Sequence, residues 1–224
     1  SKLAKAIIVA AKTGGGDPET NIRLRTAIAD ARMASMPKDN ITRAIKKGTG
    51  ELAGGDVHEI TYEGYGPSGV AVICDILTDN RNRTAPEIRK LFEKHGGKLG
   101  STNCVAWNFE RKGLFLVSLD DVDEENLMEI AMEAGAEDMQ QTGDHMELTC
   151  DPDIYTDVGD ALESAGITVD SKQVTRLAQN TITLSVDEAR PVLNLMEDLD
   201  DYDDVQNVSA NFELSAEAMA EFSG

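Results

Sequence analysis

The spacing of apolar residues changes once along this chain, near residue 58, and that change restricts the fold more than any other feature. In residues 1–48 the apolar side chains recur every three or four positions, which is typical of amphipathic helices. From residue 58 short apolar runs alternate with helical segments, and the run over 69–77 is apolar enough for a central strand. The sequence therefore predicts an α+β protein whose first domain consists of helices alone.

Three short helices are predicted within residues 1–54. The first covers residues 1–12 and ends at a run of three glycines. Asp17 and Pro18 then suit the capping position and the first turn of a second helix. A third helix is expected to start near residue 39 or 40 and to end at Gly48, because glycine tolerates the left-handed conformation that closes many helices. Together they predict one small helical domain.

The remaining residues are predicted to form two αβ domains of the ferredoxin-like kind. Residues 113–178 have the order β-α-β-β-α-β. Residues 179–224 read as β-α-β without partners, so they either complete the sheet begun at residue 58 or form an appended third unit. The first alternative predicts one αβ domain from 55–112 plus 179–224, with 113–178 inserted in it. Within 55–112, strands are expected over 60–63, 69–77 and 105–109 and a helix over 84–95.

The net charge of −20 is distributed unevenly. Residues 1–54 contain ten Lys and Arg against five Asp and Glu, whereas residues 113–178 contain two against seventeen and residues 179–224 contain one against eleven. This asymmetry predicts an N-terminal module with an anionic partner, although for the acidic half an ordinary solvated surface is an equal alternative. No apolar run reaches the length of a membrane span and no signal peptide pattern is present, so a cytoplasmic protein is expected.

The candidate binding residues are basic side chains on the predicted helices and on one loop. Such clusters bind phosphate backbones because each neutralised phosphate releases a counterion; a solvated helix face that complements the helix dipole is the alternative. Arg81 and Arg83 lie in a loop before the helix over 84–95, where a helix N-terminus favours anions. There the alternative is that Asn82 or Thr84 caps the helix and the arginines are solvated. The helical candidates are Arg23, Arg25, Arg32, Lys38, Arg43, Lys46 and Lys47.

The patterns of catalytic and cofactor sites are mostly missing. Residues 64–69 fit the text of a dinucleotide-binding motif, but they precede a strand instead of a helix. The three histidines and three cysteines lie in separate segments, which predicts neither a metal site nor disulfides. No catalytic residue, cofactor, metal or small-molecule substrate is therefore predicted. The acidic runs 120–125 and 197–204 could attract divalent cations, and a metal-dependent hydrolase using residues 200–204 is kept as a third hypothesis.

Base stacking is not predicted either. Aromatic residues make up only 4% of the chain, and none is interleaved with a basic strand. The sheets that bind single-stranded RNA by stacking depend on such a pattern.

Several sequence blocks occur in a fixed order over nearly the whole chain. They are GGGDPETN at 14–21, MPKDNI at 36–41, AIKKG at 44–48, YEGYGP at 62–67, LTDNRNRT at 77–84 and VQNV at 205–208. In this order they resemble the YebC/PmpR family. The resemblance implies a helical N-terminal domain and two αβ domains around a cleft. It also implies a DNA-binding transcriptional regulator, with mitochondrial relatives that activate translation and bacterial members tied to ribosomes stalled on proline-rich sequences.

The chain departs from this family at three places. The family's strongly basic extreme N-terminus is absent from a sequence that begins at Ser1, which leaves part of the expected nucleic-acid surface outside it. Ile22 stands where proline is common, and Asn103-Cys104 where smaller residues usually lead into the strand. Neither substitution falls on a proposed contact.

The sequence thus favours a non-enzymatic, cytoplasmic, DNA-binding transcriptional regulator. The alternative is a translation factor whose basic domain and Arg81/Arg83 loop meet ribosomal RNA. No membrane partner is expected in either case.

Overall fold

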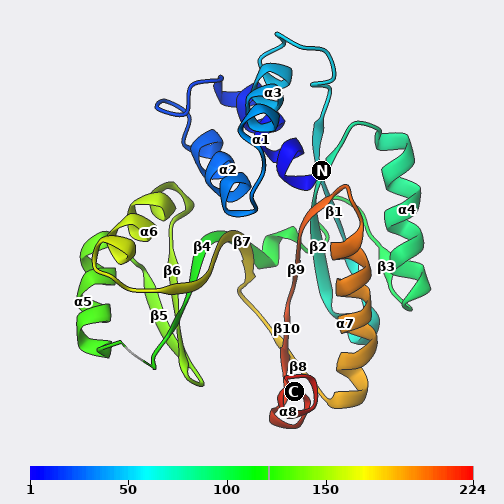
Figure 1. Cartoon of the computed structure of the whole chain (residues 1–224). Helices are drawn as coiled ribbons and strands as arrows, with labels where there is room; N and C mark the ends of the chain where they lie inside the picture. Colours follow the sequence, from blue (N-terminus) through cyan, green and yellow to red (C-terminus); the bar gives the residue numbers. More distant parts are fainter. Residues whose placement is uncertain (121, 224) are drawn as a thin grey trace. The chain divides into compact units, whose positions relative to one another are not determined.

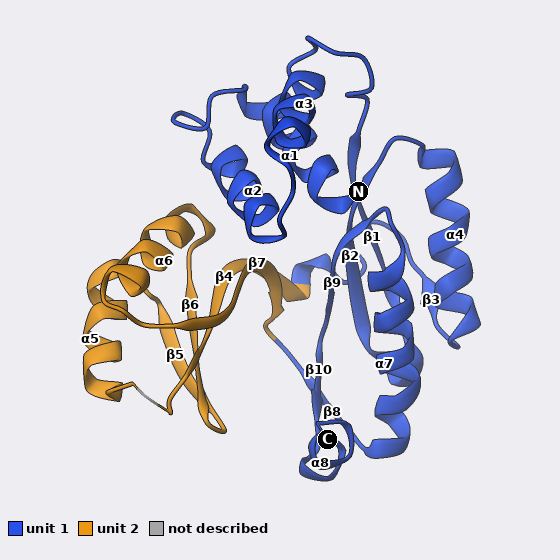
Figure 2. Cartoon of the chain, in the orientation of Figure 1, with its two compact units in different colours: residues 1–107, 180–224 blue, residues 108–179 orange. Residues whose placement is uncertain are grey.

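The computed structural model describes residues 1–120 and 122–223, which form two compact units (Figure 2). Unit 1 comprises Ser1–Trp107 and the chain from Asn180 onward, and unit 2 comprises Asn108–Gln179. Unit 1 begins with helices alone and continues into an antiparallel sheet, and unit 2 is a second antiparallel sheet with two helices. This order confirms the predicted α+β class.

Three helices open unit 1: α1 (Lys2–Gly14), α2 (Ile22–Met33) and α3 (Lys38–Gly48) (Figure 1). Their apolar stripes meet in one core that contains Ile7, Leu24 and Ile41. Leu77, which belongs to the sheet of unit 1, is part of the same core. The helices are therefore packed onto the sheet by apolar burial, which is the main favourable term in such contacts.

The predicted start of the second helix is wrong. Asp17 accepts a hydrogen bond from the backbone N–H of Glu19 at 2.9 Å, so Asp17 and Pro18 belong to a turn. The helix begins four residues after Pro18, where the side chain of Asn21 accepts from the N–H of Leu24 at 3.1 Å. The amide of Asn21 also donates to the carbonyl of Ala10 at 2.8 Å, so α1 fixes the cap of α2.

Gly48 does not close the third helix in a left-handed conformation as predicted. It is the last residue of α3, and the positive φ of 85° occurs at Gly50. A Cβ atom on Gly48 would lie 2.4 Å from the carbonyl oxygen of Ile8. Glycine is required there because α3 approaches the backbone of α1 closely.

The sheet of unit 1 has the strand order β3-β1-β2-β9. β9 pairs antiparallel with β2, so the C-terminal segment adds a strand to the sheet begun at residue 58, and the residues of unit 2 are inserted between its strands. Helices α4 and α7 contribute Ile88, Phe92 and Leu195 to the core of this sheet. The elements are β1 (His58–Tyr65), β2 (Ala71–Thr78), α4 (Arg81–Lys94), β3 (Lys98–Leu99), α7 (Val186–Asp201) and β9 (Val205–Ala210), with β8 (Ile182–Leu184), β10 (Phe212–Leu214) and α8 (Ala216–Phe222) beside them.

Unit 2 has the strand order β5-β6-β4-β7, with every neighbouring pair antiparallel. This is the order of a ferredoxin-like sheet, as the sequence of elements predicts. Its core includes Phe115, which stacks on Tyr155 with ring centroids 5.1 Å apart. The elements are β4 (Phe109–Ser118), α5 (Glu124–Ala134), β5 (Asp138–Thr142), β6 (His145–Cys150), α6 (Tyr155–Ser164) and β7 (Val169–Ala178).

The strand predicted over 105–109 is wrong. Ala106–Asn108 form a 3-10 turn, and β4 starts only at Phe109. The apolar character of this segment comes from a buried loop residue, Val105, which is 1% exposed.

Candidate nucleic-acid interface

Helix α3 presents three of the predicted basic residues on its exposed face. Ile41 and Ala44 are buried in the helical core, whereas Lys38, Arg43 and Lys46 are exposed. Their helical spacing brings these three to one side of α3. In the described part of the chain, none of the three side chains takes part in an ion pair. We call Lys38, Arg43 and Lys46 the basic face of α3.

The basic residues of α3 differ in how they relate to the helix dipole. Lys46 and Lys47 lie in the last turn of α3, where cations complement the helix dipole. Lys38 is the first residue of α3, where the dipole disfavours a cation, and Pro37 before it supplies no side-chain cap. Asp39 is the acidic residue of this first turn, where its charge complements the dipole. The dipole therefore accounts for Lys46 and Lys47 and leaves Lys38 unexplained.

The arginines of α2 differ from one another in their contacts. Arg23 forms an exposed ion pair with Glu59 at 2.5 Å. Arg25 donates to the carbonyl oxygens of Pro18 at 3.1 Å and Glu19 at 3.0 Å, so it stabilises the turn before α2. Arg32 is exposed and has no protein partner within the described residues. Among the described residues, Arg32 is therefore the arginine of this helix whose side chain has no hydrogen-bond or ion-pair partner. Lys47, the remaining candidate on α3, is half-buried.

Arg81 and Arg83 lie in the first turn of α4 and not in a loop. The cap is neither Asn82 nor Thr84, because the side chain of Asn80 accepts from the N–H of Arg83 at 3.1 Å. Arg81 is exposed. Arg83 is about half exposed but is not a free cation, since its guanidinium donates to Asp204 at 3.0 Å and to Asp79 at 3.0 Å. The two arginines that the sequence groups together therefore have different surroundings.

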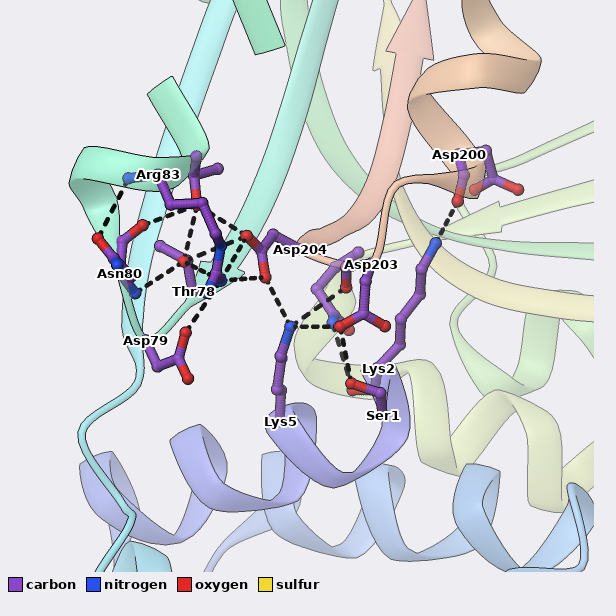
Figure 3. Close-up of polar contacts among 12 residues, drawn as sticks. Ser1, Lys2, Lys5, Thr78, Asp79, Asn80, Arg83, Asp200, Asp203 and Asp204 are labelled. Atoms are coloured by element: carbon purple, nitrogen blue, oxygen red, sulfur yellow. Dashed lines mark hydrogen bonds and ion pairs between the residues drawn. The ribbon is translucent and has the colours of Figure 1, made fainter. Parts of the chain in front are cut away.

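Asp204 is the centre of a polar cluster that joins α1 to the sheet (Figure 3). Its side chain is almost fully buried and accepts from Lys5 Nζ at 2.7 Å and from Thr84 Oγ1 at 2.7 Å, in addition to Arg83. Lys5 also contacts the carboxylate of Asp203 at 3.1 Å. Two cations from distant parts of the chain thus neutralise one buried carboxylate.

The pKa of Asp204 depends on two opposing effects in this cluster, burial and hydrogen bonding. Burial by itself would raise the pKa, but the hydrogen bonds from Lys5, Thr84 and Arg83 outweigh burial and lower it to about 2. The pKa of Lys5 is raised, because its bonds to Asp204 and Asp203 outweigh the effect of burial. Both groups are therefore charged at neutral pH, and the cluster is a buried salt bridge that holds the helices on the sheet.

The metal-dependent hydrolase hypothesis for residues 200–204 gains no support from this cluster. Asp204 is already neutralised by Lys5 and Arg83, and the carbonyl oxygen of Asp200 accepts from Lys2 Nζ. Within residues 1–120 and 122–223, no three His, Cys, Asp or Glu side chains gather closely enough to hold a metal ion. The other acidic run, 120–125, includes Asp121, which lies outside the described residues.

Sequence patterns gave no signal for the role of Lys5. It belongs to the amphipathic first helix, and its partner Asp204 lies 199 residues away along the chain.

Residues 64–69, which fit the text of a dinucleotide-binding motif, form the end of β1 and a 3-10 turn (Pro67–Gly69). Strand β2 follows them, so no helix N-terminus is present there to hold a pyrophosphate. Among the described residues, no helix combines the length and apolar character needed to cross a membrane.

Comparison with known proteins covers almost the whole chain. Residues 1–51 match the TACO1/YebC protein N-terminal domain, and residues 57–212 match the TACO1/YebC second and third domain. A probable transcriptional regulatory protein of Rhodopirellula baltica is 53% identical over 222 residues, which cover 99% of this chain and 90% of that protein. A probable transcriptional regulatory protein of Natranaerobius thermophilus is 51% identical over 98% of this chain and 89% of its own length.

A solved structure has the same fold. The crystal structure of a conserved hypothetical protein, Aq1575 from Aquifex aeolicus, is 46% identical in sequence and superimposes with a TM-score of 0.85. The match covers 96% of this chain and 88% of the Aquifex chain.

Proposed function

This chain belongs to the TACO1/YebC family, and from that premise we propose that it is a transcriptional regulator that binds DNA through the basic face of α3. The names of its relatives support a regulatory role. The observation that carries the proposal is the exposed set Lys38, Arg43 and Lys46, because no acidic side chain among the described residues neutralises these charges. Arg32 and Arg81 are the further exposed cations of unit 1 proposed to extend this surface.

The proposed activity is binding without a catalytic step. The most perturbed carboxylate, Asp204, is held by two cations in a structural cluster, so it is not poised to transfer a proton. Cys74 is fully buried, and burial raises the pKa of its thiol, which keeps it protonated and unreactive. The proposal places the protein in the cytoplasm, where it would meet DNA without a cofactor.

The rest of the chain makes this surface selective. A polyanion is attracted to residues 1–54, with their excess of five positive charges, and is repelled by the strongly acidic residues 113–224. Binding should therefore use the helical domain in one orientation and depend strongly on ionic strength.

Salt titration of binding to a labelled DNA duplex tests the proposal. With about three to four phosphates contacted, the logarithm of the affinity should fall linearly with the logarithm of salt concentration, with a slope of roughly −3 to −4. Absence of binding, or affinity that is independent of salt, would contradict it. The affinity for a structured RNA of the same length, measured in parallel, distinguishes DNA from RNA as the partner. If the protein binds the RNA more tightly than the DNA duplex, the translation-factor alternative is favoured over the DNA-binding regulator.

A further inference from the structure

Two strongly exposed aromatic side chains of unit 1 meet at one backbone carbonyl. Trp107 is 64% exposed and Tyr65 is 45% exposed. The indole N–H of Trp107 donates to the carbonyl oxygen of Cys104 at 3.0 Å, and the hydroxyl of Tyr65 donates to the same oxygen at 3.4 Å. Because both polar ring atoms are used on this oxygen, the exposed area that remains on the two side chains is mostly aromatic carbon.

A buried carboxylate fixes the loop that carries this pair. Glu63 is only 4% exposed, and it accepts hydrogen bonds from the backbone N–H groups of Asn103 at 2.7 Å, Val105 at 3.1 Å and Ala106 at 2.7 Å. Hydrogen bonds from backbone N–H groups to a charged acceptor are strong, so the loop before Trp107 is held firmly on the sheet. The aromatic pair is therefore preorganised, and a ligand would lose little free energy in ordering it.

A lysine lies beside the pair. Tyr65 and Glu63 are two residues apart on β1, so both side chains are on the same face of the sheet. Lys98 on β3 is the cross-strand partner of Tyr65, which places its exposed side chain on that face too. Two flat apolar rings with a neighbouring cation suit an unpaired nucleobase and its phosphate, whereas an apolar peptide would not require the lysine.

We propose that Tyr65 and Trp107 form a stacking site for an unpaired base of a bound nucleic acid, with Lys98 contacting the adjoining phosphate. This inference rests on the proposed function and deepens it, because it adds contact with an unpaired base to the proposed binding of nucleic acid. The sequence predicts no stacking, since Tyr65 and Trp107 lie on separate elements and become neighbours only through the loop that Glu63 holds.

Trp107 is the only tryptophan of the chain, so its fluorescence reports on this site alone. A single-stranded oligothymidylate should quench the emission of Trp107 in a saturable way, while a blunt duplex of the same length should bind without comparable quenching. Binding itself is followed independently by the anisotropy of a label on the oligonucleotide.

Variants separate stacking from hydrogen bonding. Trp107→Ala and Tyr65→Ala should each weaken single-strand binding roughly 5- to 150-fold, as loss of base stacking does. Trp107→Phe removes the indole N–H but keeps an aromatic face, so it should retain most of the affinity. Met132→Ala is the matched control, because Met132 is also 64% exposed but lies in unit 2, and its affinity should not change.

The outcomes distinguish this inference from the proposed function. Quenching together with weaker binding by both alanine variants supports the stacking site. The stacking site is wrong, and the proposed function stands, if wild type and Trp107→Ala bind each oligonucleotide with the same affinity and if the emission of Trp107 in wild type does not change on binding. If neither oligonucleotide binds, both fail. Circular dichroism and thermal unfolding establish that each variant is folded. If Trp107→Phe, which retains an aromatic ring, binds single strands as weakly as Trp107→Ala, the stacking role is also wrong.

Discussion

Two sets of cations in unit 1 show how the same residue types take different roles. Lys5 and the half-exposed Arg83 both contact the buried carboxylate of Asp204, so their charges are neutralised by a partner within the fold. Lys38, Arg43 and Lys46 lie on an exposed helix face without acidic partners among the described residues. The first set stabilises the docking of α1 on the sheet, and the second leaves positive charge for an external anion. Pairing, more than charge count, decides which cations are available for binding.

Replacing Asp204 should have the largest effect on stability. Asp204→Asn keeps the size of the side chain but leaves Lys5 and Arg83 without their buried partner, so the free energy of unfolding should fall by about 2–4 kcal/mol. Urea unfolding followed by circular dichroism measures the change. An unfolding free energy that stays within about 0.5 kcal/mol of wild type would show that the cluster does not stabilise the docking of α1.

Acid should weaken the same cluster. Because the pKa of Asp204 is about 2 in the folded protein and near 3.8 without its partners, its ionised form favours the folded state. The contribution is fully present above about pH 4 and is lost as the pH falls toward 2, at a cost of roughly 2 kcal/mol. Unfolding free energies measured across this range should fall less steeply in Asp204→Asn. Identical pH profiles would assign the acid sensitivity to other carboxylates.

Breaking an exposed ion pair should have a much smaller effect. Arg23 and Glu59 are both about half exposed, and solvent screens such pairs. Arg23→Ala should therefore change the free energy of unfolding by less than about 1 kcal/mol, measured by the same urea titration. A loss as large as that of Asp204→Asn would contradict the distinction between exposed and buried pairs.

The basic face of α3 should contribute least to stability. Lys38→Ala, Arg43→Ala and Lys46→Ala remove exposed side chains with no protein partners, so their combined effect on thermal unfolding should be small, within about 0.5 kcal/mol per residue. A cooperative loss of stability in the triple variant would indicate that these cations serve the fold.

Local patterns were sufficient for most elements of this fold. The helical periodicity predicts α1 and α3 closely, and the order of elements predicts the ferredoxin-like sheet of unit 2, because both signals lie within short segments. The errors arise where a distant residue intervenes. Asn21 caps α2 because it also reaches the carbonyl of Ala10. Residues 105–108 form no strand because the carboxylate of Glu63 accepts from the N–H groups of Val105 and Ala106.

The candidate site shows the same limit. Exposure of Lys38, Arg43 and Lys46 follows from the apolar stripe of one helix, so the sequence was sufficient to predict that they are exposed, whereas Lys47, predicted on the same face, is half-buried. The pairing of Arg83 was not predictable, because Asp204 is 121 residues away along the chain and reaches α4 only through the pairing of β9 with β2. The meeting of Tyr65 with Trp107 depends in the same way on a loop that no local pattern describes.

The salt dependence of DNA binding tests the central claim most directly. The triple variant Lys38→Ala/Arg43→Ala/Lys46→Ala should reduce the magnitude of the log–log slope for a DNA duplex by roughly 3, because each lost phosphate contact lowers it by about 0.9. Arg89→Ala/Lys90→Ala, which removes two exposed cations from α4, should leave the slope nearly unchanged. Equal slopes for wild type and the triple variant would contradict the assignment of the basic face of α3 as the nucleic-acid interface.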